Sequence, residues 1–545
     1  MQDADAARLV ERLRAPGCYS HPAAAVEVLE THISWVVLAG DFAYKIKKPV
    51  HLDFVDFSTL ERRRHCCEEE LRLNRRTAPD LYLEVVPITG TVDAPVVHGS
   101  GAALEHAVKM RRFAQEALLD RVAQGGALTE VHVDAFARSV AAFHGRVARA
   151  GGNVAFGSPA EVLAEATGNF TLLEAIDELP DTRARRQVLR DWTGRECARL
   201  EEAIAHRRRD GFVRECHGDL HLGNVALLAG EPVAFDAIEF NAAFRWIDVM
   251  NEVAFPVMDL FHHGLPRLAH RFLDAYLDAT GDYAGLAVLR FYLVYRAMVR
   301  AKVSCIRAHQ AGVADADRER SAAAYRGHLD LAGRLARPAA PALIAMHGLA
   351  GSGKSSVSQE LLEALGAVRV RSDVERKRLH GLAAQARTGS APGAGLYSAA
   401  ADRLTYGRLA ALAGECLAAG YPVIVDATFL SRSWREAFRD IARDRGARFA
   451  LVGCTAPLEM LRARVECRSR EGIDASEAGL AVLERQRAGV EALGDDELPD
   501  AVLVDTSAGK GLPAGVLESL AQRLALDVAG PGETGLGEVQ RQRDG

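Results

Sequence analysis

The alternation of hydrophobic and polar positions changes along the chain, and the first hundred or so residues have the pattern of a sheet. Short apolar segments are separated there by turn residues, which is typical of strands. The two segments on either side of Gly40 and Asp41 predict a hairpin that turns at these residues. The predicted strands are residues 32–40, 41–49, 81–90 and 106–113.

A helix is predicted between these strands, over residues 58–79. Ser58 is its candidate N-cap and Pro79 its candidate stop. From about residue 116 to residue 334 the pattern is mainly helical. One interruption, at residues 216–240, predicts a loop followed by two short strands.

A Pro- and Ala-rich stretch at residues 336–341 predicts a linker between two domains. Beyond it, strands alternate with helical segments, and this pattern predicts a parallel α/β sheet. The predicted domains are residues 1–335 and 342–527, followed by a disordered tail at residues 528–545. The predicted strands of the second domain are residues 342–348, 368–373, 421–429 and 447–454.

Composition supports this division and excludes several classes of protein. The 545 residues are too many for one hydrophobic core, and 49% apolar with 26% charged residues is typical of globular domains. The net charge of -6 gives no general attraction to nucleic acid. No apolar run approaches the length of a membrane-spanning helix, so we expect no membrane partner. Nine cysteines without a CxxC pair favour reduced thiols in a cytoplasmic protein.

The most specific motif follows directly after the first strand of the C-terminal domain. Residues 348–355 fit G-x-x-x-x-G-K-[ST] at every defined position, between an apolar strand and a helix. Glycines let such a loop fold tightly, so that its N–H groups converge on phosphates. Lys354 would act in catalysis on the β- and γ-phosphates of ATP, and Ser355 would bind Mg²⁺. The predicted ATP-binding residues here are Gly348, Leu349, Ala350, Gly351, Ser352, Gly353, Lys354, Ser355 and Ser356.

Two carboxylates come at the ends of later strands in this domain. Asp373 would lie near the γ-phosphate, where a general base for an acceptor hydroxyl is needed. The alternative is that Ser372 or Asp373 caps the next helix. Arg376, one helical turn on, could act in catalysis by holding a phosphate or the acceptor. Asp426 ends an apolar strand in the form of a Walker B site, where a carboxylate holds Mg²⁺ or its water.

An arginine-rich helix is predicted at residues 461–470. Arg464 and Arg468 share one of its faces, and in a lid they would bind ATP and neutralise the transferring phosphoryl group. The alternative is a solvated basic face.

These motifs together resemble the P-loop kinases that act on small molecules or polynucleotide ends, with zeta-toxin and chloramphenicol phosphotransferase as relatives. The resemblance covers roughly residues 341–527. It implies a P-loop α/β fold and phosphorylation of a hydroxyl, with Asp373 as the base and Arg376 as a phosphate contact.

A second motif, H-x-D-x-x-x-x-N, lies at residues 217–224 of the N-terminal domain. In kinase catalytic loops the Asp accepts the substrate proton and the Asn binds Mg²⁺, which assigns these roles to Asp219 and Asn224. Asp236 ends a short apolar strand twelve residues later, so it is placed to bind Mg²⁺ where kinases use the Asp of D-F-G. The alternative for each residue alone is an ordinary turn, but the combined spacing favours a kinase loop.

The sequence HGDLHLGN resembles the catalytic loop of the aminoglycoside phosphotransferase family, which includes choline and fructosamine kinases. The resemblance covers roughly residues 20–330. It implies a bilobal, protein-kinase-like α+β fold, whose first lobe ends near residue 113. In that fold His217 would brace the catalytic loop, and Asp248 would be a downstream structural acid.

The same resemblance implies that Lys45 contacts the α- and β-phosphates of ATP. A helix glutamate should pair with it, and Glu68, Glu69 and Glu70 compete for that place, with Glu70 preferred. The strand at residues 108–113 would be the hinge under the adenine. One departure is that the turn near Gly40 lacks the G-x-G-x-x-G of protein kinases.

As a whole, the chain resembles bifunctional aminoglycoside phosphotransferase/ATP-binding proteins. Three hypotheses follow. The first is a tandem kinase that transfers the ATP γ-phosphoryl to small-molecule hydroxyls in both domains, with Mg²⁺ as cofactor. The second is a kinase of nucleic-acid 5′-hydroxyl ends, which the acidic charge and the lack of an aromatic-basic strip do not favour. The third is an ATP-binding regulatory protein.

Overall fold

The computed structural model describes residues 3–529 except for residues 53–54, 153, 178–179, 311, 385, 387, 389–394, 472–475, 508, 510–511 and 514. The chain forms a first unit of residues 1–162 and 204–256, and a second unit of residues 163–203 and 257–545. The predicted linker at 336–341 lies inside the second unit, and that domain boundary stays a prediction. The tail predicted at residues 528–545 lies outside the described residues from residue 530 onward.

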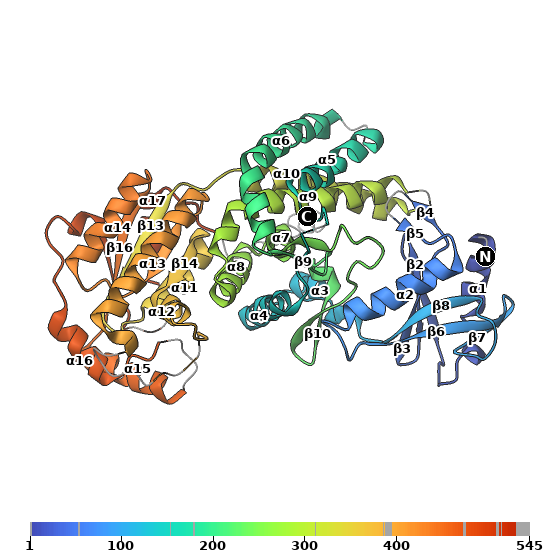
Figure 1. Cartoon of the computed structure of the whole chain (residues 1–545), viewed down its shortest axis with the longest axis horizontal. Coiled ribbons are helices and arrows are strands. Elements are labelled where there is room, and N and C mark those ends of the chain that lie inside the picture. Colours follow the sequence, from blue (N-terminus) through green and yellow to red (C-terminus); the bar gives the residue numbers. More distant parts are fainter. Residues whose placement is uncertain are drawn as a thin grey trace, which may run out of the picture. The chain divides into compact units, whose positions relative to one another are not determined.

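The first unit contains a six-stranded antiparallel sheet with the order β1-β2-β3-β8-β6-β7 (Figure 1). The predicted hairpin is confirmed, because Ala39 of β2 lies opposite Phe42 of β3. Side chains alternate between the faces, so Val37 packs with α1 while Leu38 packs on the side of α2. The elements are α1 (Asp3–Arg12), β1 (Val26–Glu30), β2 (Ser34–Ala39), β3 (Phe42–Lys47), β4 (His51–Leu52), β5 (Val55–Asp56), α2 (Leu60–Asn74), β6 (Tyr82–Thr91), β7 (Ala94–Val97) and β8 (Glu105–Arg111).

Helix α2 spans residues 60–74 of the predicted range 58–79, and its N-cap lies one residue later than predicted. The Thr59 hydroxyl accepts a hydrogen bond from the N–H of Arg62 at 3.3 Å, which makes Thr59 the N-cap. Ser58 instead donates its hydroxyl hydrogen to Asp56 at 2.6 Å. The two hydroxyl residues are adjacent, so sequence alone did not separate them.

Short strands and helices complete the first unit. β9 pairs with β12 and β10 with β11, both antiparallel. The loop between β9 and β10 carries the H-x-D-x-x-x-x-N motif and ends in a 3-10 turn at Leu222–Asn224. The further elements are α3 (Leu119–Gln124), α4 (Glu130–Arg146), β9 (Val213–Glu215), β10 (Val225–Leu228), β11 (Glu231–Ala234) and β12 (Trp246–Asp248). Helix α7 (Val249–His262) begins in the first unit and ends in the second.

The second unit begins with long helices. α9 and α10 pack along one another. Arg186 of α6 donates to Tyr325 of α10 at 3.0 Å, and this contact is buried. The helices are α5 (Pro159–Ile176), α6 (Pro180–Arg209), α8 (Pro266–Thr280), α9 (Leu286–His309) and α10 (Asp315–Leu335).

A parallel five-stranded sheet, with the order β14-β15-β13-β16-β17, forms the rest of the second unit. Ile344 and Met346 of β13 point into a core that also holds α11 and α17. Helices α13 and α14 contact each other and the same sheet, so helices cover both faces (Figure 1). The strands are β13 (Ala342–His347), β14 (Val368–Arg371), β15 (Val423–Asp426), β16 (Arg448–Thr455) and β17 (Ala501–Asp505).

The four predicted strands of this sheet are confirmed, and β17 is an additional one. β17 is short and lies at an edge, with Leu503 exposed, so its pattern does not resemble a buried strand. The helices are α11 (Lys354–Leu365), α12 (Ser372–Leu379), α13 (Ala399–Ala418), α14 (Arg432–Asp444), α15 (Leu458–Glu471), α16 (Leu480–Gly489) and α17 (Val516–Leu524). The mixed α/β class predicted from the sequence is thus confirmed, with a P-loop sheet in the C-terminal part.

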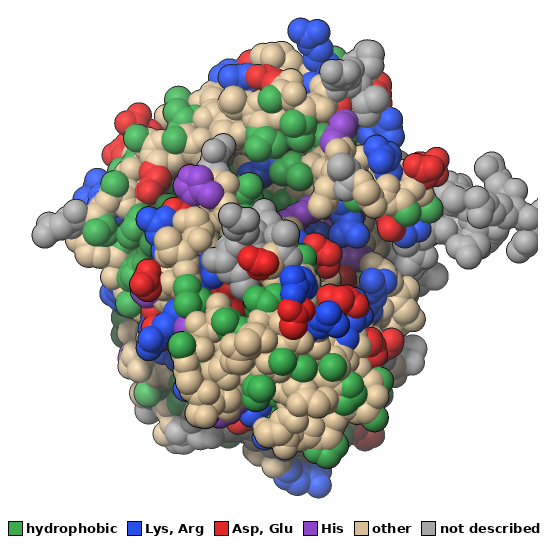
Figure 2. Space-filling model, turned by 90° about the vertical axis from the view of Figure 1, so that its right-hand side faces the viewer, with side chains coloured by type: hydrophobic (Ala, Val, Ile, Leu, Met, Phe, Trp, Pro, Cys, Tyr) green, Lys and Arg blue, Asp and Glu red, His purple; other side chains and the backbone are tan. Residues whose placement is uncertain are grey.

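In the described part of the chain, no helix has the length and apolar character needed to cross a membrane. On the face of the molecule seen in Figure 2, lysine and arginine side chains lie among aspartates and glutamates. That face therefore carries no broad field of one sign.

Two candidate nucleotide sites

The first site gathers around Lys45 of β3. Its ammonium contacts Glu70 of α2 at 2.9 Å and also contacts Asp236. Of the three competing glutamates, Glu68 pairs with Arg64 and Glu69 with Arg72, so Glu70 is the one that reaches Lys45. The predicted hinge begins in β8, where residue 108 lies opposite Lys45.

Lys47 belongs to the same cluster, although the sequence interpretation did not include it. Residues two apart on a strand share a face, so Lys47 points the same way as Lys45. It is fully buried and contacts both Glu70 and Glu239. Glu70 therefore lies between two ammonium groups. The K-x-K spacing on a predicted strand was the available sequence signal.

The charges of this cluster support one another. Burial lowers the pKa of Lys45, but the nearby carboxylates of Asp236 and Glu70 outweigh it, so the pKa lies well above its ordinary value. Burial raises the pKa of Asp236, but Lys45 outweighs it and the pKa lies below its ordinary value. Both groups are therefore charged at neutral pH. The backbone φ of Asp236 is +65°, in the left-handed region that Asp tolerates better than most residues.

The structure brings the catalytic-loop motif and Asp236 together. The Asn224 amide donates to the backbone oxygen of Asp219 at 2.9 Å and to its carboxylate at 3.1 Å. His217 donates through Nε2 to the Phe235 carbonyl at 2.8 Å, and the Phe235 N–H donates to the Asn224 carbonyl at 2.9 Å. The hairpin of β10 and β11 thus places Asp236 beside Asn224, twelve residues away in the chain.

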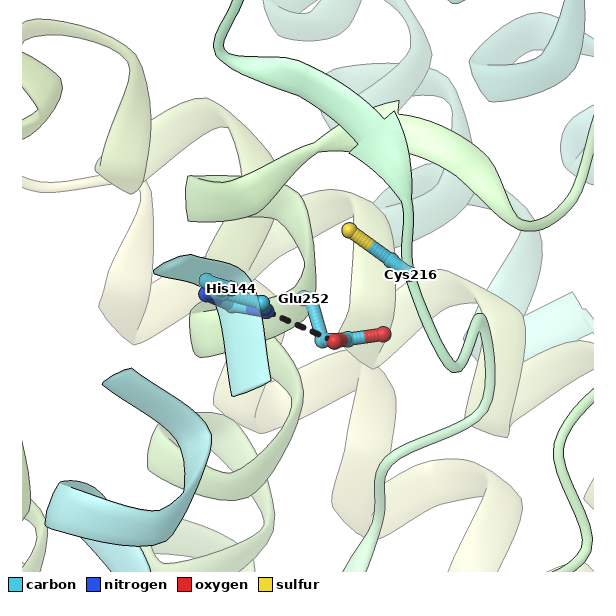
Figure 3. Close-up of side chains that lie close together, drawn as sticks. All are labelled: His144, Cys216 and Glu252. Carbon is cyan, nitrogen blue, oxygen red and sulfur yellow. Dashed lines mark hydrogen bonds and ion pairs between the residues drawn. The ribbon is translucent and has the colours of Figure 1, made fainter. Parts of the chain in front are cut away.

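Two residues that sequence reasoning missed, Glu252 and His144, support the catalytic loop: Glu252 contacts it directly, and His144 contacts Glu252. One carboxylate oxygen of Glu252, in α7, accepts from the N–H groups of His217 at 2.6 Å and Gly218 at 2.8 Å. The other lies 2.7 Å from His144 Nε2, in α4 (Figure 3). Cys216 completes a buried His–Cys–Glu group whose ligand-type atoms lie within 4.8 Å of one another. No motif links these positions, so nothing in the sequence pointed to them.

Asp248, predicted to be a structural acid, lies outside this loop. Its carboxylate accepts from Arg207 at 2.7 and 2.9 Å, and both side chains are buried. The pair connects the end of α6 to β12 within the first unit.

We expect Glu252→Gln to remove an acid-sensitive part of the stability. Burial raises the pKa of Glu252, but the hydrogen bond from His144 and the backbone N–H groups lower it by more, from 4.5 to about 2. A carboxylate whose pKa is lower in the folded than in the unfolded chain stabilises the folded state, and this stabilisation is complete above the pKa of the unfolded chain. It is lost as the pH falls from about 4.5 to about 2. The difference corresponds to about 3 kcal/mol.

Chemical unfolding of the full chain and the Gln variant between pH 7 and pH 3 measures this effect. The stability gap should be largest at pH 7 and shrink below pH 4.5. Glu231→Gln, at an exposed position, is the control and should show no gap. A gap for Glu252→Gln that stays constant with pH would contradict the prediction.

The second site is built on the loop between β13 and α11. Gly348, Gly351 and Gly353 have φ values of +140°, +79° and +85°, which L side chains rarely adopt. A Cβ on Gly348 would lie 2.5 Å from the Cys454 carbonyl oxygen, and one on Gly351 would lie 2.7 Å from that of Leu461. The glycines of the motif are therefore required by backbone shape and close packing.

Lys354 lies at the start of α11 with its ammonium held inside the loop. Nζ donates to the carbonyls of Gly348 and Leu349, both at 2.8 Å. Burial lowers its pKa. The loop, Asp373 and Asp426 all follow parallel strands, so they meet at the same edge of the sheet. They line a pocket of about 470 Å³.

Most of the residues predicted for this site line that pocket. They are Ala350, Gly351, Gly353, Lys354, Ser355, Ser356, Asp373, Arg376, Asp426, Arg464 and Arg468. Gly348, Leu349 and Ser352 belong to the same glycine loop but are not among the residues that line the pocket. Ser372 and Asp373 lie in the first turn of α12, whose N-cap position is Arg371 without a side-chain cap, so the capping alternative is wrong.

Asp426 is buried and accepts a hydrogen bond from the Ser358 hydroxyl at 3.2 Å. Arg369 of β14 donates to the same hydroxyl at 3.2 Å and to the Ser355 carbonyl at 3.3 Å. Its other nitrogen donates to Asp274 of α8 at 2.8 Å. Helix α8 is thus connected through Arg369 to the first turns of α11.

The arginines of α15 divide into two groups. Arg464 donates to Thr506 at 2.7 and 3.0 Å, and Arg468 donates to the Ala478 carbonyl at 3.0 Å. Arg462 instead forms an exposed pair with Glu484. The alternative of a solvated basic face therefore applies to Arg462 but not to the two residues that line the pocket.

The wall formed by α13 and α14 was not predicted. Arg376 donates to Asp402 at 2.7 Å. Tyr406 and Trp434 stack with ring centroids 4.7 Å apart and planes at 13°. Asp402, Tyr406 and Trp434 all line the pocket. They are far apart in sequence and belong to no motif, so only the folded helices show that they share a wall.

Comparison with known proteins shows which proteins this chain is similar to. Residues 343–493 match the family model of an AAA domain. The chain is 32% identical over 476 residues to "Uncharacterized protein Rv2004c" of Mycobacterium tuberculosis, which covers 86% of this chain and 92% of that protein. The chain belongs to the family of this mycobacterial protein. "Uncharacterized protein Mb2027c" of Mycobacterium bovis matches to the same extent.

The match to this relative takes in both halves of the chain, since it spans most of each protein. Among solved structures, an amicoumacin kinase in complex with AMP-PNP, Ca²⁺ and Ami is 14% identical, covering 61% of this chain and 96% of that one, with a TM-score of 0.40. A gluconokinase from Sinorhizobium meliloti 1021 is 25% identical, covering 38% of this chain and 98% of that one, with a TM-score of 0.23.

Proposed function

We propose that the protein is a tandem ATP-dependent phosphotransferase. The N-terminal site would act on a hydroxyl of an aminoglycoside or sugar-like molecule, and the C-terminal site on a hydroxyl of another small acceptor. One observation carries the proposal. Each site brings together a carboxylate suited to act as base, a buried ammonium and oxygen donors suited to Mg²⁺.

In the N-terminal site, Asp219 would take the proton of the acceptor hydroxyl as its oxygen attacks the γ-phosphorus and the bond to ADP breaks. Lys45, held by Glu70, would neutralise charge on the phosphates. The amide oxygen of Asn224 and the carboxylate of Asp236 are hard oxygen ligands of the kind Mg²⁺ prefers. Bound Mg²⁺ would offset phosphate charge. The Asn224 amide nitrogen donates to Asp219, so the amide oxygen of Asn224 is directed away from Asp219.

In the C-terminal site, the N–H groups of the glycine loop and Lys354 would hold the β- and γ-phosphates. The Ser355 hydroxyl and Asp426 would hold Mg²⁺, and they fit it as oxygen donors. Asp373 would be the base. Arg376, Arg464 and Arg468 line the same pocket and would stabilise charge on the transferring phosphoryl.

The acceptor class is supported by the size of this pocket. A volume of about 470 Å³ is within the range of small-molecule sites. The wall opposite the glycine loop offers an aromatic face, a carboxylate and an arginine. Such a mixture suits a polar, hydroxyl-bearing molecule.

A transfer screen on the full chain tests the proposal. The protein is incubated with γ-labelled ATP, Mg²⁺ and aminoglycosides, sugars, amino sugars, nucleosides or 5′-hydroxyl oligonucleotides. Label on small molecules supports the proposal. Label on oligonucleotides alone would make the protein an end-processing kinase. Nucleotide binding without any transfer would make it a regulatory ATP-binding protein.

We expect Lys354→Ala to weaken nucleotide binding at the C-terminal site and spare the N-terminal one. The variant removes the only charge that the loop itself directs at the phosphates. A titration with a fluorescent ATP analogue should show two classes of site in the parent chain and one in the variant. Arg462→Ala, on the exposed side of α15, is the control and should keep both. Two unchanged classes in Lys354→Ala would refute the assignment.

A further inference from the structure

Helix α2, which carries Glu70, is tied to the strand that leads into the catalytic loop. Both oxygens of Glu215 in β9 accept from Arg72 of α2, at 2.8 and 3.1 Å. Arg76, one turn later, donates to the Glu215 carboxylate at 3.2 Å and its carbonyl at 2.6 Å. It also donates to the carbonyl of Cys216 at 3.0 Å.

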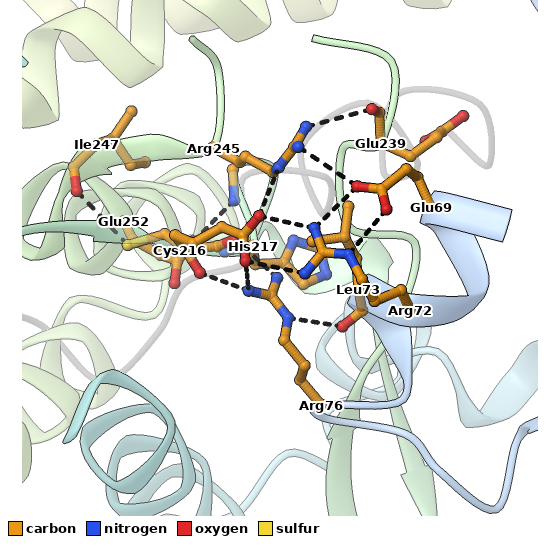
Figure 4. A network of polar contacts seen from close by, with 12 residues as sticks. Glu69, Arg72, Leu73, Arg76, Cys216, His217, Glu239, Arg245, Ile247 and Glu252 are labelled. Atoms are coloured by element: carbon orange, nitrogen blue, oxygen red, sulfur yellow. Dashed lines mark hydrogen bonds and ion pairs between the residues drawn. The ribbon is translucent and has the colours of Figure 1, made fainter. Parts of the chain in front are cut away.

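A third arginine joins from the other side of the loop. Arg245 donates to Glu215 at 3.2 Å. It also donates to the carbonyl of Glu239 at 3.2 Å, and this second contact can be followed in Figure 4. One carboxylate therefore contacts three guanidinium groups. Its side chain is only 10% exposed, and those of Arg76 and Arg245 are 17% and 9% exposed, so salt screens these two contacts less than it would at the surface. Arg72 is 47% exposed, so its contact is screened more. Burial raises the pKa of Glu215, but the arginines outweigh it and hold the pKa below its ordinary value.

A second tie joins the end of α2 to the segment after Asp236. The Asn74 side-chain oxygen accepts from the N–H of Ala237 at 2.9 Å, and Asn74 is fully buried. The helix is therefore held both to the strand before His217 and to the irregular segment that follows Asp236, the predicted metal ligand. Glu70 lies on α2 between Glu69 and Arg72, within one turn of the clamped residues.

The position of this helix decides whether the Lys45–Glu70 pair exists. In kinases, catalysis requires the pair between the strand lysine and the helix glutamate, and movement of the helix breaks it. Here the contacts to Glu215 restrain that movement. Glu215 ends β9 two residues before His217, so the restraint reaches the catalytic loop through Cys216 alone.

We propose that Glu215 is a positioning residue that keeps α2, and with it Glu70, locked against the catalytic loop, so that the N-terminal site is permanently assembled. This inference rests on the proposed phosphotransfer at that site. In switchable kinases, regulatory phosphorylation controls the position of this helix and so the lysine–glutamate pair. Here three arginines and one carboxylate would have that role. Glu215 is not among the residues proposed to bind ATP or the acceptor.

The test is a double-mutant cycle in the full chain carrying Lys354→Ala, so that only the N-terminal site turns over ATP. Glu215→Gln should lower kcat by about 10- to 100-fold, because a small displacement of a positioned group has effects of that size. KM for ATP should change much less. In a Glu70→Gln background the same substitution should have almost no further effect on kcat, because both act through one contact.

Glu68→Gln is the control, since Glu68 is on α2 but pairs with exposed Arg64, and its kcat should be unchanged. Hydrogen exchange of the α2 amides should rise in Glu215→Gln and stay unchanged in α4. Additive effects of Glu215→Gln and Glu70→Gln would overturn the positioning role, even if exchange rises. If the parent shows no transfer, the proposed function fails, and unchanged α2 exchange in Glu215→Gln would then overturn the lock as well.

Discussion

Replacing Asp219 with asparagine should lower phosphoryl transfer by the N-terminal site about 10²–10⁴-fold, the usual effect of losing a catalytic base. Asparagine has the same shape, and it can keep a contact with the Asn224 amide, which lies 3.1 Å from the Asp219 carboxylate. The loop should therefore keep its conformation while the proton acceptor is lost. Nucleotide affinity should change little, because Lys45 and Asp236 remain.

The measurement is single-turnover transfer from labelled ATP to the best acceptor, in the full chain with Lys354→Ala. A nucleotide titration on the same samples separates chemistry from binding. Asp80→Asn is the control, an exposed acid of the same unit. Its rate should equal that of the parent. A rate for Asp219→Asn within a few-fold of the parent would show that another group accepts the proton.

Replacing Asp274 with alanine should destabilise the second unit by about 3–5 kcal/mol, the cost of leaving a buried charge without its partner. Asp274 and Arg369 are each only 7% exposed and lie 2.8 Å apart. Arg369 also donates to the Ser355 carbonyl and the Ser358 hydroxyl. Weaker nucleotide binding at the C-terminal site should therefore accompany the loss of stability.

Chemical unfolding of the full chain, followed together with nucleotide affinity, measures both effects. The control is Asp330→Ala in the same unit. Asp330 pairs with Arg185 at 2.7 Å, but the side chains are 52% and 46% exposed. Such a pair contributes about 0–1 kcal/mol. Equal, small losses in the two variants would contradict the importance of the buried contact.

These contacts also bear on where the C-terminal domain begins. Glu363 of α11 pairs with Arg271 at 2.8 Å, and Arg371 of β14 pairs with Asp278 at 3.1 Å. These ion pairs join α11 and β14 of the P-loop part to α8. A fragment starting at residue 342 would lack the α8 partners of Glu363, Arg369 and Arg371. The intact chain keeps these partners and is therefore the form to use in the experiments.

The sequence by itself predicted the features that depend on short stretches of chain. The glycine loop at residues 348–355 is a contiguous motif, and its neighbouring strand and helix have clear periodicity. The spacing of Asp219 and Asn224 is likewise local, and the helix that pairs Glu70 with Lys45 has a recognisable pattern. Asp373 and Asp426 were both predicted at the ends of strands in a parallel sheet, and the carboxyl ends of parallel strands lie at the same edge of a sheet.

Only the tertiary structure decided which distant charges support these motifs. Glu252 lies 35 residues from His217 and 108 from His144, while Asp274 lies 95 residues from Arg369. In sequence, each is an acid on a helix that could equally face solvent. A buried carboxylate differs from an exposed one only through the elements packed around it, and that packing depends on long-range contacts. The motifs are therefore readable from the chain, whereas the groups that hold them in place, Glu215 among them, are not.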